Sequence, residues 1–116
     1  MLRYYREVVA LDLDIAVAPL KANTFNRCKS AVKMLELGMC GIPIIASYFG
    51  PYKEYYDDGA VVDTARDAGD WFDALETFIE RKATRAIVAE EHLNQVEQFH
   101  TQFFALGAWE AILNAL

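Results

Sequence analysis

Two short, strongly apolar segments constrain the fold of this chain more than any other feature. One covers residues 14–18 (Asp-Ile-Ala-Val-Ala) and the other covers residues 43–47 (Pro-Ile-Ile-Ala-Ser). Short apolar runs bounded by turn residues are typical of strands buried on both faces of a parallel sheet. After the Asp58-Gly59 turn, residues 60–62 (Ala-Val-Val) predict a third short strand.

Helical patterns separate these strands. Residues 2–11 predict a short helix, and the polar residues 21–26 predict a loop. A longer helix is expected over about residues 27–39, with Asn26 as its N-cap and its end at Gly41. The next connection is expected to contain a turn at Gly50-Pro51 and a short helical turn at residues 52–56.

The rest of the chain reads as helical. Asp70, with Asp73 three residues later, resembles a capping box and predicts the start of a helix. A further helix is expected over about residues 84–99. The core stripe predicted for the helix after Asp70 consists of Trp71, Phe72, Leu75, Phe78 and Ile79. A last helix is expected to carry Leu106, Trp109, Ile112, Leu113 and Leu116.

Strands alternating with helices predict an α/β fold, a parallel three-layer Rossmann-like half-domain followed by C-terminal helices. Right-handed crossovers would place the three strands side by side in chain order. A length of 116 residues suits one domain, and we treat residues 1–116 as a single partial domain. Such sheets bind ligands beyond the carboxyl ends of their strands, here residues 19–26, 47–52 and 63 onward.

Composition excludes several classes of function. The formal net charge of −6 argues against non-specific binding to nucleic acid or to anionic lipid. Cys28 and Cys40 have no metal-ligand spacing and are interpreted as reduced thiols of a cytosolic protein. No apolar run is long enough for a transmembrane segment, and charged residues interrupt the N-terminus where a signal peptide would be apolar.

Several basic residues lie near the predicted N-terminus of a helix, where positive charge is unfavourable. Arg27, Lys29 and Lys33 would occupy the first two turns of the helix predicted after Asn26, where the helix dipole disfavours cations. A bound anion would compensate, because helix N-termini and lysines both attract phosphate. Glu36 would share their face and could accept hydrogen bonds from sugar hydroxyls. The alternative is a solvated face with Lys33 and Glu36 as an ordinary surface pair.

The segment Lys33–Ser47 resembles a signature of GT-B glycosyltransferases, in which a Lys-x-x-Glu helix leads into a Gly-x-Pro-hydrophobic-hydrophobic-Ala strand. Residues 14–20 resemble the strand that precedes this helix, and Asn26–Ser30 resembles a Phe-Asn-x-x-Lys-Ser variant found in enzymes of surface polysaccharide synthesis. Downstream, Gly50–Glu54 and the Asp58-Gly59 turn match the donor-side loop and the turn before the last strand. The resemblance covers about residues 12–83.

The resemblance implies roles for particular residues. Glu36 would hold the donor ribose, Lys33 would lie near the phosphates, and Ser47–Tyr52 would border the donor. Many members carry a second Glu eight residues earlier, where this chain has Cys28. No catalytic residue, metal ligand or cofactor is assigned, since the nucleotide-diphosphate sugar is a substrate. The expected donor-binding residues are Asn26, Lys29, Ser30, Lys33, Glu36, Ser47, Gly50, Pro51 and Tyr52.

The resemblance further implies a retaining glycosyltransferase of surface polysaccharide or lipopolysaccharide synthesis, of which this chain is the C-terminal, donor-binding part. Its partners would be the nucleotide-sugar donor and a missing N-terminal, acceptor-binding half, so the isolated chain is expected to be inactive. Without that preceding part, the strand at residues 15–18 would lie at an open sheet edge, which favours a two-fold dimer. We expect a cytoplasmic location, or one peripheral to the inner membrane for the full enzyme.

This chain lacks residues that two other classes of α/β protein require. A receiver-like domain needs acidic residues at the ends of strands, whereas Asp14 begins its strand, and a dinucleotide oxidoreductase needs a Gly-x-Gly-x-x-Gly that is absent. A truncated, non-catalytic α/β interaction domain fits the fold prediction equally well, and titration with nucleotide diphosphates would separate the two. His92 and His100 are expected to lie away from the site, and the tyrosines at 4, 5, 55 and 56 are interpreted as packing residues.

Overall fold

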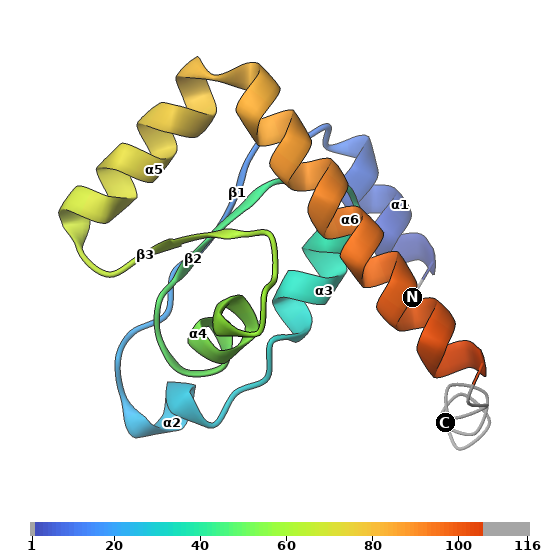
Figure 1. Cartoon of the computed structure of the whole chain (residues 1–116), viewed down its shortest axis with the longest axis horizontal. Coiled ribbons are helices and arrows are strands. Elements are labelled where there is room, and N and C mark those ends of the chain that lie inside the picture. Colours follow the sequence, from blue (N-terminus) through green and yellow to red (C-terminus); the bar gives the residue numbers. More distant parts are fainter. Residues whose placement is uncertain (1, 106–116) are drawn as a thin grey trace.

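The computed structural model describes residues 2–105, and side chains over residues 3–98 (Figure 1). Its centre is a parallel sheet of β1 (Ala16–Ala18), β2 (Ile44–Ser47) and β3 (Asp63–Ala65), in the order β1-β2-β3. The helices are α1 (Leu2–Ala10), α2 (Thr24–Arg27), α3 (Val32–Met39), α4 (Gly50–Asp57), α5 (Ala68–Glu80) and α6 (Lys82–Ala105). The predicted α/β fold and the strand order are confirmed.

Helices cover both faces of the sheet, which gives three layers (Figure 1). Strand β2 shows why: Ile44 and Ala46 pack with Met34 of α3 and Tyr52 of α4, whereas Ile45 packs with Phe78 of α5. Ile44, Ile45 and Ala46 are all fully buried. Burial on both faces is the reason that β2 is continuously apolar in sequence.

The predicted third strand is displaced. Residues 60–62 were expected to form it, but β3 begins at Asp63. The backbone N–H of Val61 donates to the side-chain Oε1 of Gln95 at 2.8 Å, and Val62 is buried in the core just before the strand. The apolar residues therefore form a partly buried approach to β3. Among the described residues the strand itself pairs only with β2, and it tolerates the partly exposed Asp63 and Thr64.

The helix expected over residues 27–39 begins later than predicted. Helix α3 confirms residues 32–39 as helical, whereas residues 28–31 form a connection and the end of the predicted 21–26 loop is part of α2. Asn23, not Asn26, is an N-cap: its Oδ1 accepts from the backbone N–H of Asn26 at 2.8 Å and starts α2. Asn26 lies buried inside α2, where its Nδ2 donates to the carbonyl of Lys21 at 2.8 Å. The amide is thereby used to close the connection after β1. Helix α3 begins after Ala31 without a side-chain cap.

The start and the buried face of α5 also differ from prediction. Asp67 is the N-cap and accepts from the backbone N–H of Asp70 at 2.8 Å, while Asp70 accepts in turn from that of Arg66 at 2.9 Å. Asp70 therefore lies at N3, the last position of a capping-box-like arrangement, and not at the N-cap. The buried stripe contains Trp71, Ala74, Leu75 and Phe78, whereas the predicted core residues Phe72 and Ile79 are 66% and 60% exposed.

Helix α1 matches the predicted N-terminal helix. Gly50 and Pro51 were predicted as a turn, but they form the start of α4, because proline suits the first turn of a helix. Helix α6 contains the predicted 84–99 helix and packs across α3. The helix predicted beyond Leu106 lies outside the described residues. Among the described residues, no helix is both long and apolar enough to cross a membrane.

Candidate functional site

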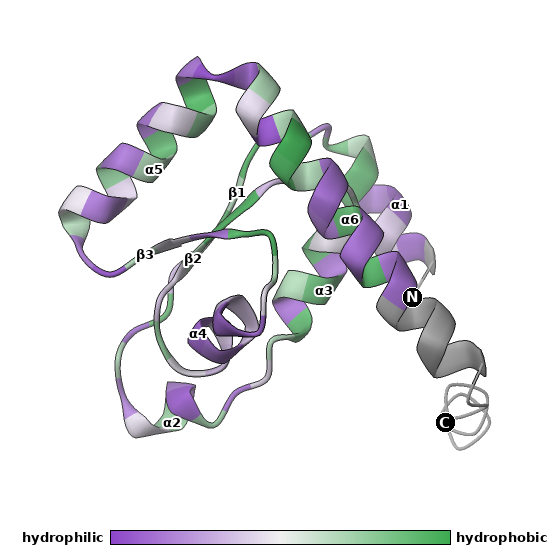
Figure 2. Ribbon diagram, in the orientation of Figure 1, coloured by the Kyte–Doolittle hydropathy of each residue, from purple (hydrophilic) through white to green (hydrophobic). Residues whose placement is uncertain are grey.

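The part of the chain that forms the carboxyl ends of β1 and β2 is basic, although the chain as a whole is acidic. From Ile15 to Lys53 the sequence holds five lysines and arginines and a single carboxylate, that of Glu36, although the whole chain has a net charge of −6. Helix α2 and the start of α4 lie together beyond the carboxyl ends of β1 and β2 (Figure 1). Helix α4 is largely hydrophilic, in contrast to the apolar β1 (Figure 2). The positive charges at this edge of the sheet would therefore attract an anionic ligand.

Lys33 and Glu36 form the centre of the candidate site, on α3. The Nζ of Lys33 lies 4.0 Å from Oε2 of Glu36, and their side chains are 52% and 30% exposed. The hydroxyl of Tyr4, on α1, approaches the same Oε2 at 3.4 Å. Both contacts are long for their type, so the carboxylate retains capacity to accept hydrogen bonds from a ligand.

An open groove of about 460 Å³ runs along β1 beside this pair. The groove is lined by β1 and the residues that flank this strand. Lys33 and Leu37 of α3 and Tyr52 of α4 complete its walls. Two predicted donor-binding residues, Lys33 and Tyr52, are thus brought to one cavity from different helices. Tyr52 is only 9% exposed, so it contributes to the wall chiefly through its ring.

The carboxyl edge of the sheet is shaped by three predicted site residues that support the backbone, namely Ser47, Gly50 and Pro51. The Oγ of Ser47 accepts a hydrogen bond from the backbone N–H of Leu20 at 2.7 Å, which ties the end of β2 to the segment after β1. Gly50 has a φ of +57°, and a Cβ there would lie 3.2 Å from the Cα of Arg27. Only glycine suits both conditions, because a side chain would be strained in this conformation and would press on backbone. Pro51 is buried.

Lys29 and Ser30 do not join Lys33 in the way expected. They are exposed in the connection between α2 and α3, so the predicted helical face shared by Lys29, Lys33 and Glu36 does not form. The Nζ of Lys29 lies 5.1 Å from the ring of Phe25 instead. The exposed Cys28 stands in the same connection.

A cluster of cations around aromatic rings was missed from the sequence. The guanidinium of Arg66 lies 4.4 Å from the ring centre of Tyr48, and the Nζ of Lys53 lies 5.7 Å from it. The Tyr48 hydroxyl donates to Asp57 at 2.9 Å, which raises the pKa of this tyrosine. The signal was available, since Arg66 follows a strand, but the third strand was predicted to end too early for Arg66 to be noticed.

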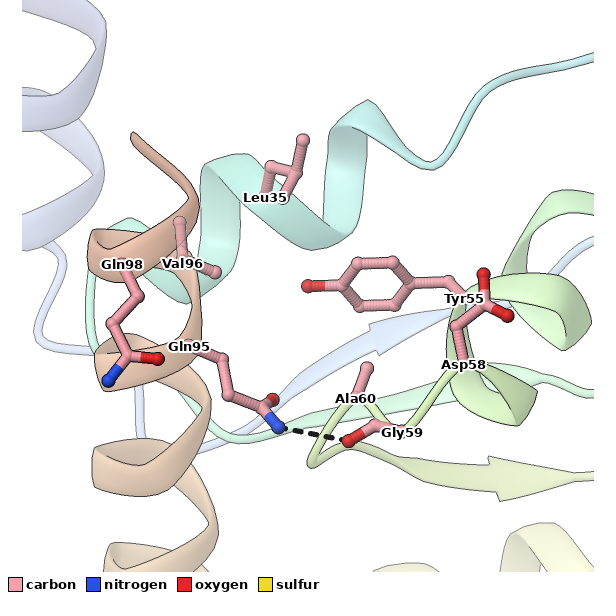
Figure 3. Close-up of a pocket in the computed structure, with 8 residues that line it drawn as sticks. All are labelled: Leu35, Tyr55, Asp58, Gly59, Ala60, Gln95, Val96 and Gln98. Carbon is pink, nitrogen blue, oxygen red and sulfur yellow. Dashed lines mark hydrogen bonds between the residues drawn. The ribbon is translucent and has the colours of Figure 1, made fainter. Parts of the chain in front are cut away.

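A second cavity, of about 450 Å³, lies between α3, α6 and the segment after α4 (Figure 3). Tyr55 extends into it from α4, and Gln95 of α6 donates to the carbonyl of Gly59 at 2.9 Å. The Tyr55 hydroxyl lies 2.6 Å from Nε2 of the buried His92. Burial lowers the pKa of His92 to about 4 and raises the pKa of Tyr55 to about 12, so both are neutral at pH 7. A neutral pair of this kind has no charge with which to hold phosphate.

Comparison with known families identifies the class of protein. The sequence model of a family described as glycosyl transferase-like matches residues 5–102. The chain belongs to the glycosyl transferase-like family. The match includes most of α1, from residue 5 onward, the whole sheet and most of α6, and it confirms the glycosyltransferase relationship that the Lys33–Ser47 segment indicated. Comparison with curated proteins and with solved structures found no match. No group of side chains suited to a metal ion occurs among the described residues.

Proposed function

We propose that this chain binds the nucleotide-diphosphate sugar donor of a retaining glycosyltransferase, as the C-terminal part of a GT-B enzyme of surface polysaccharide or lipopolysaccharide synthesis. Membership of the glycosyl transferase-like family supports the reaction class. The observation that carries donor binding is the pairing of Lys33 with Glu36, a single carboxylate within a basic stretch, beside an open groove at the sheet. No cofactor is needed for this chemistry.

The proposed contacts follow from charge. A diphosphate would lie near Lys33 and the first turn of α3, where cationic and backbone N–H groups meet it. The ribose hydroxyls would donate to the carboxylate of Glu36. During transfer, negative charge grows on the departing nucleotide diphosphate, and cations already in place stabilise it without reorganising. Gly50, Pro51, Ser47 and Tyr52 would shape the wall beside the donor.

Transfer also requires an acceptor held against the donor, because proximity supplies much of the rate acceleration. We propose that another domain supplies the acceptor surface, so the 116-residue chain alone should bind donor without transferring sugar. Incubation of the purified chain with donor and candidate acceptors tests this part. Robust turnover would contradict it.

Donor binding is tested by calorimetry with uridine and guanosine diphosphates. Lys33→Ala and Glu36→Gln are each expected to weaken binding by about tenfold or more, since each removes a charge-assisted interaction. Lys82→Ala and Glu90→Gln remove the same side-chain types from exposed positions of α6 and should bind as the unaltered chain does. Unchanged affinity in both site variants would refute the site. Absence of binding in every variant would favour the interaction-domain alternative.

Self-association through β1 is a further proposal about partners. Among the described residues β1 pairs only with β2, and Val17 is 51% exposed at its centre. An open strand edge with an exposed apolar side chain favours pairing with another chain. Sedimentation at micromolar concentration should show a dimer, and Val17→Lys should weaken it. A monomer over the whole concentration range would contradict the proposal.

A further inference from the structure

Tyr4 makes a contact that no sequence pattern indicated. It lies on α1, 32 residues before Glu36, and its hydroxyl reaches Oε2 of that carboxylate at 3.4 Å. Helix α1 is held against the core by Val8, which packs with the cluster that contains β1 and α3. The position of the Tyr4 hydroxyl thus follows from the packing of α1 against this cluster.

The ring of Tyr4 is itself supported. Tyr5 meets it edge to face, with ring centres 5.6 Å apart and planes at 76°. The pKa of Tyr5 is raised by burial, then by the negative charge of Glu36 and by Cys40. The pKa of Cys40 is raised by burial and then by Glu36. The negative charge of Glu36 therefore lies close enough to Tyr5 and Cys40 to raise the pKa of both, in addition to its contacts with Tyr4 and Lys33.

The two oxygens of Glu36 are not equivalent. Tyr4 and Lys33 both approach Oε2, whereas no described residue forms a hydrogen bond with Oε1. A carboxylate with one oxygen restrained and one free is well suited to a pair of neighbouring hydroxyls, because each oxygen accepts more than one hydrogen bond. A glutamate side chain otherwise loses considerable rotational freedom when it binds a ligand. A restraint already present in the free protein reduces that loss.

We infer that Tyr4 is a positioning residue of the donor site: its hydroxyl restrains the Glu36 carboxylate so that Oε1 faces the 2′,3′-diol of the nucleoside. The inference rests on the proposed donor function and extends it to the first helix. It makes recognition of ribose, rather than of phosphate, the property that depends on Tyr4. Phosphate recognition stays with Lys33.

The test compares two nucleotides and two tyrosines. Tyr4→Phe removes only the hydroxyl, and it should weaken binding of uridine diphosphate by about threefold, the lower end for one hydrogen bond, because the 3.4 Å contact is long. Binding of the 2′,3′-dideoxy analogue should not change. Tyr56→Phe is the matched control, because Tyr56 is equally exposed, at 41%, and also meets a neighbouring tyrosine edge to face. It should bind both nucleotides as the unaltered chain does.

Combination with Glu36→Gln provides the decisive readout. In that background, Tyr4→Phe should have no further effect on uridine diphosphate binding, because the carboxylate it restrains is gone. Equal losses for the ribose and dideoxy ligands, or additive losses in the double variant, would overturn the inference while leaving the donor site intact. An unaltered chain that binds neither uridine nor guanosine diphosphate would overturn the inference and the proposed function together.

Discussion

The two sides of α3 hold polar groups in opposite ways. On the side of α3 that faces α6, Gly38 allows the two helices to approach closely. There His92 is 1% exposed, and its Nε2 lies 2.6 Å from the hydroxyl of Tyr55. Toward α1, Glu36 is partly exposed, with contacts of 3.4 and 4.0 Å. A short, neutral pair with a buried imidazole is suited to maintaining structure, whereas a partly exposed charge is suited to contacting a ligand. The contrast separates a structural face of α3 from the face that we propose binds the donor.

The largest expected effect concerns His92 and pH. Its pKa is lowered by burial to about 4, whereas an unfolded histidine titrates near 6.5. Between these values the unfolded chain binds the proton more readily. The free energy of unfolding should therefore fall as pH drops from about 6.5 to 4, by about 3 kcal/mol, and not fall further from this cause below pH 4.

Urea unfolding of the unaltered chain and of His92→Gln across this pH range isolates the effect. Carboxylates titrate in both chains, so the difference between the two profiles belongs to His92. Parallel profiles would show that the imidazole is not kept neutral by burial, and the proposed contrast between the two faces of α3 would be lost.

The next effect concerns the close approach of α3 and α6. A Cβ at Gly38 would lie 2.6 Å from Cε1 of His92 and 2.9 Å from Cγ2 of Val96. Gly38→Ala should therefore destabilise the fold by about 2 kcal/mol, despite the better helix propensity of alanine. Gly69→Ala is the control, since Gly69 lies exposed in α5 and its Cβ would meet only the Asp67 side chain. Similar stabilities for the two variants, measured in urea, would contradict the tight packing.

The sequence predicted those parts of the fold whose signals are local. The two buried strands, their order and the position of α1 followed from apolar runs and turn residues. The errors arose where two local signals competed. Asn26 has the chemistry of an N-cap, but Asn23 caps the preceding turn and the Asn26 amide serves the Lys21 carbonyl. Residues 60–62 have strand composition, yet they form the buried approach to β3.

In the candidate site too, local contacts could be predicted from the sequence and tertiary contacts could not. Lys33 and Glu36 are three residues apart on one helix, so their pairing is readable from spacing. Tyr4 and Glu36 meet only because α1 packs beside α3, and Arg66 reaches Tyr48 only because β3 pairs with β2. Contacts of this kind depend on tertiary packing, which no local pattern encodes. The structure therefore adds residues to the site from elements that the motif does not include.

The smallest expected effect on stability is that of Glu36→Gln. Its ion pair with Lys33 is an exposed contact between residues three apart, a type that contributes about 0.5 kcal/mol or less. The 3.4 Å approach of Tyr4 is also too long for a strong hydrogen bond. We expect the free energy of unfolding to change by less than about 0.5 kcal/mol, as in the exposed control Glu90→Gln. Urea unfolding at neutral pH measures both. A loss well above 1 kcal/mol in Glu36→Gln alone would make this carboxylate a structural group like His92, and the weakened nucleotide binding expected of the variant would then have to be attributed to the fold.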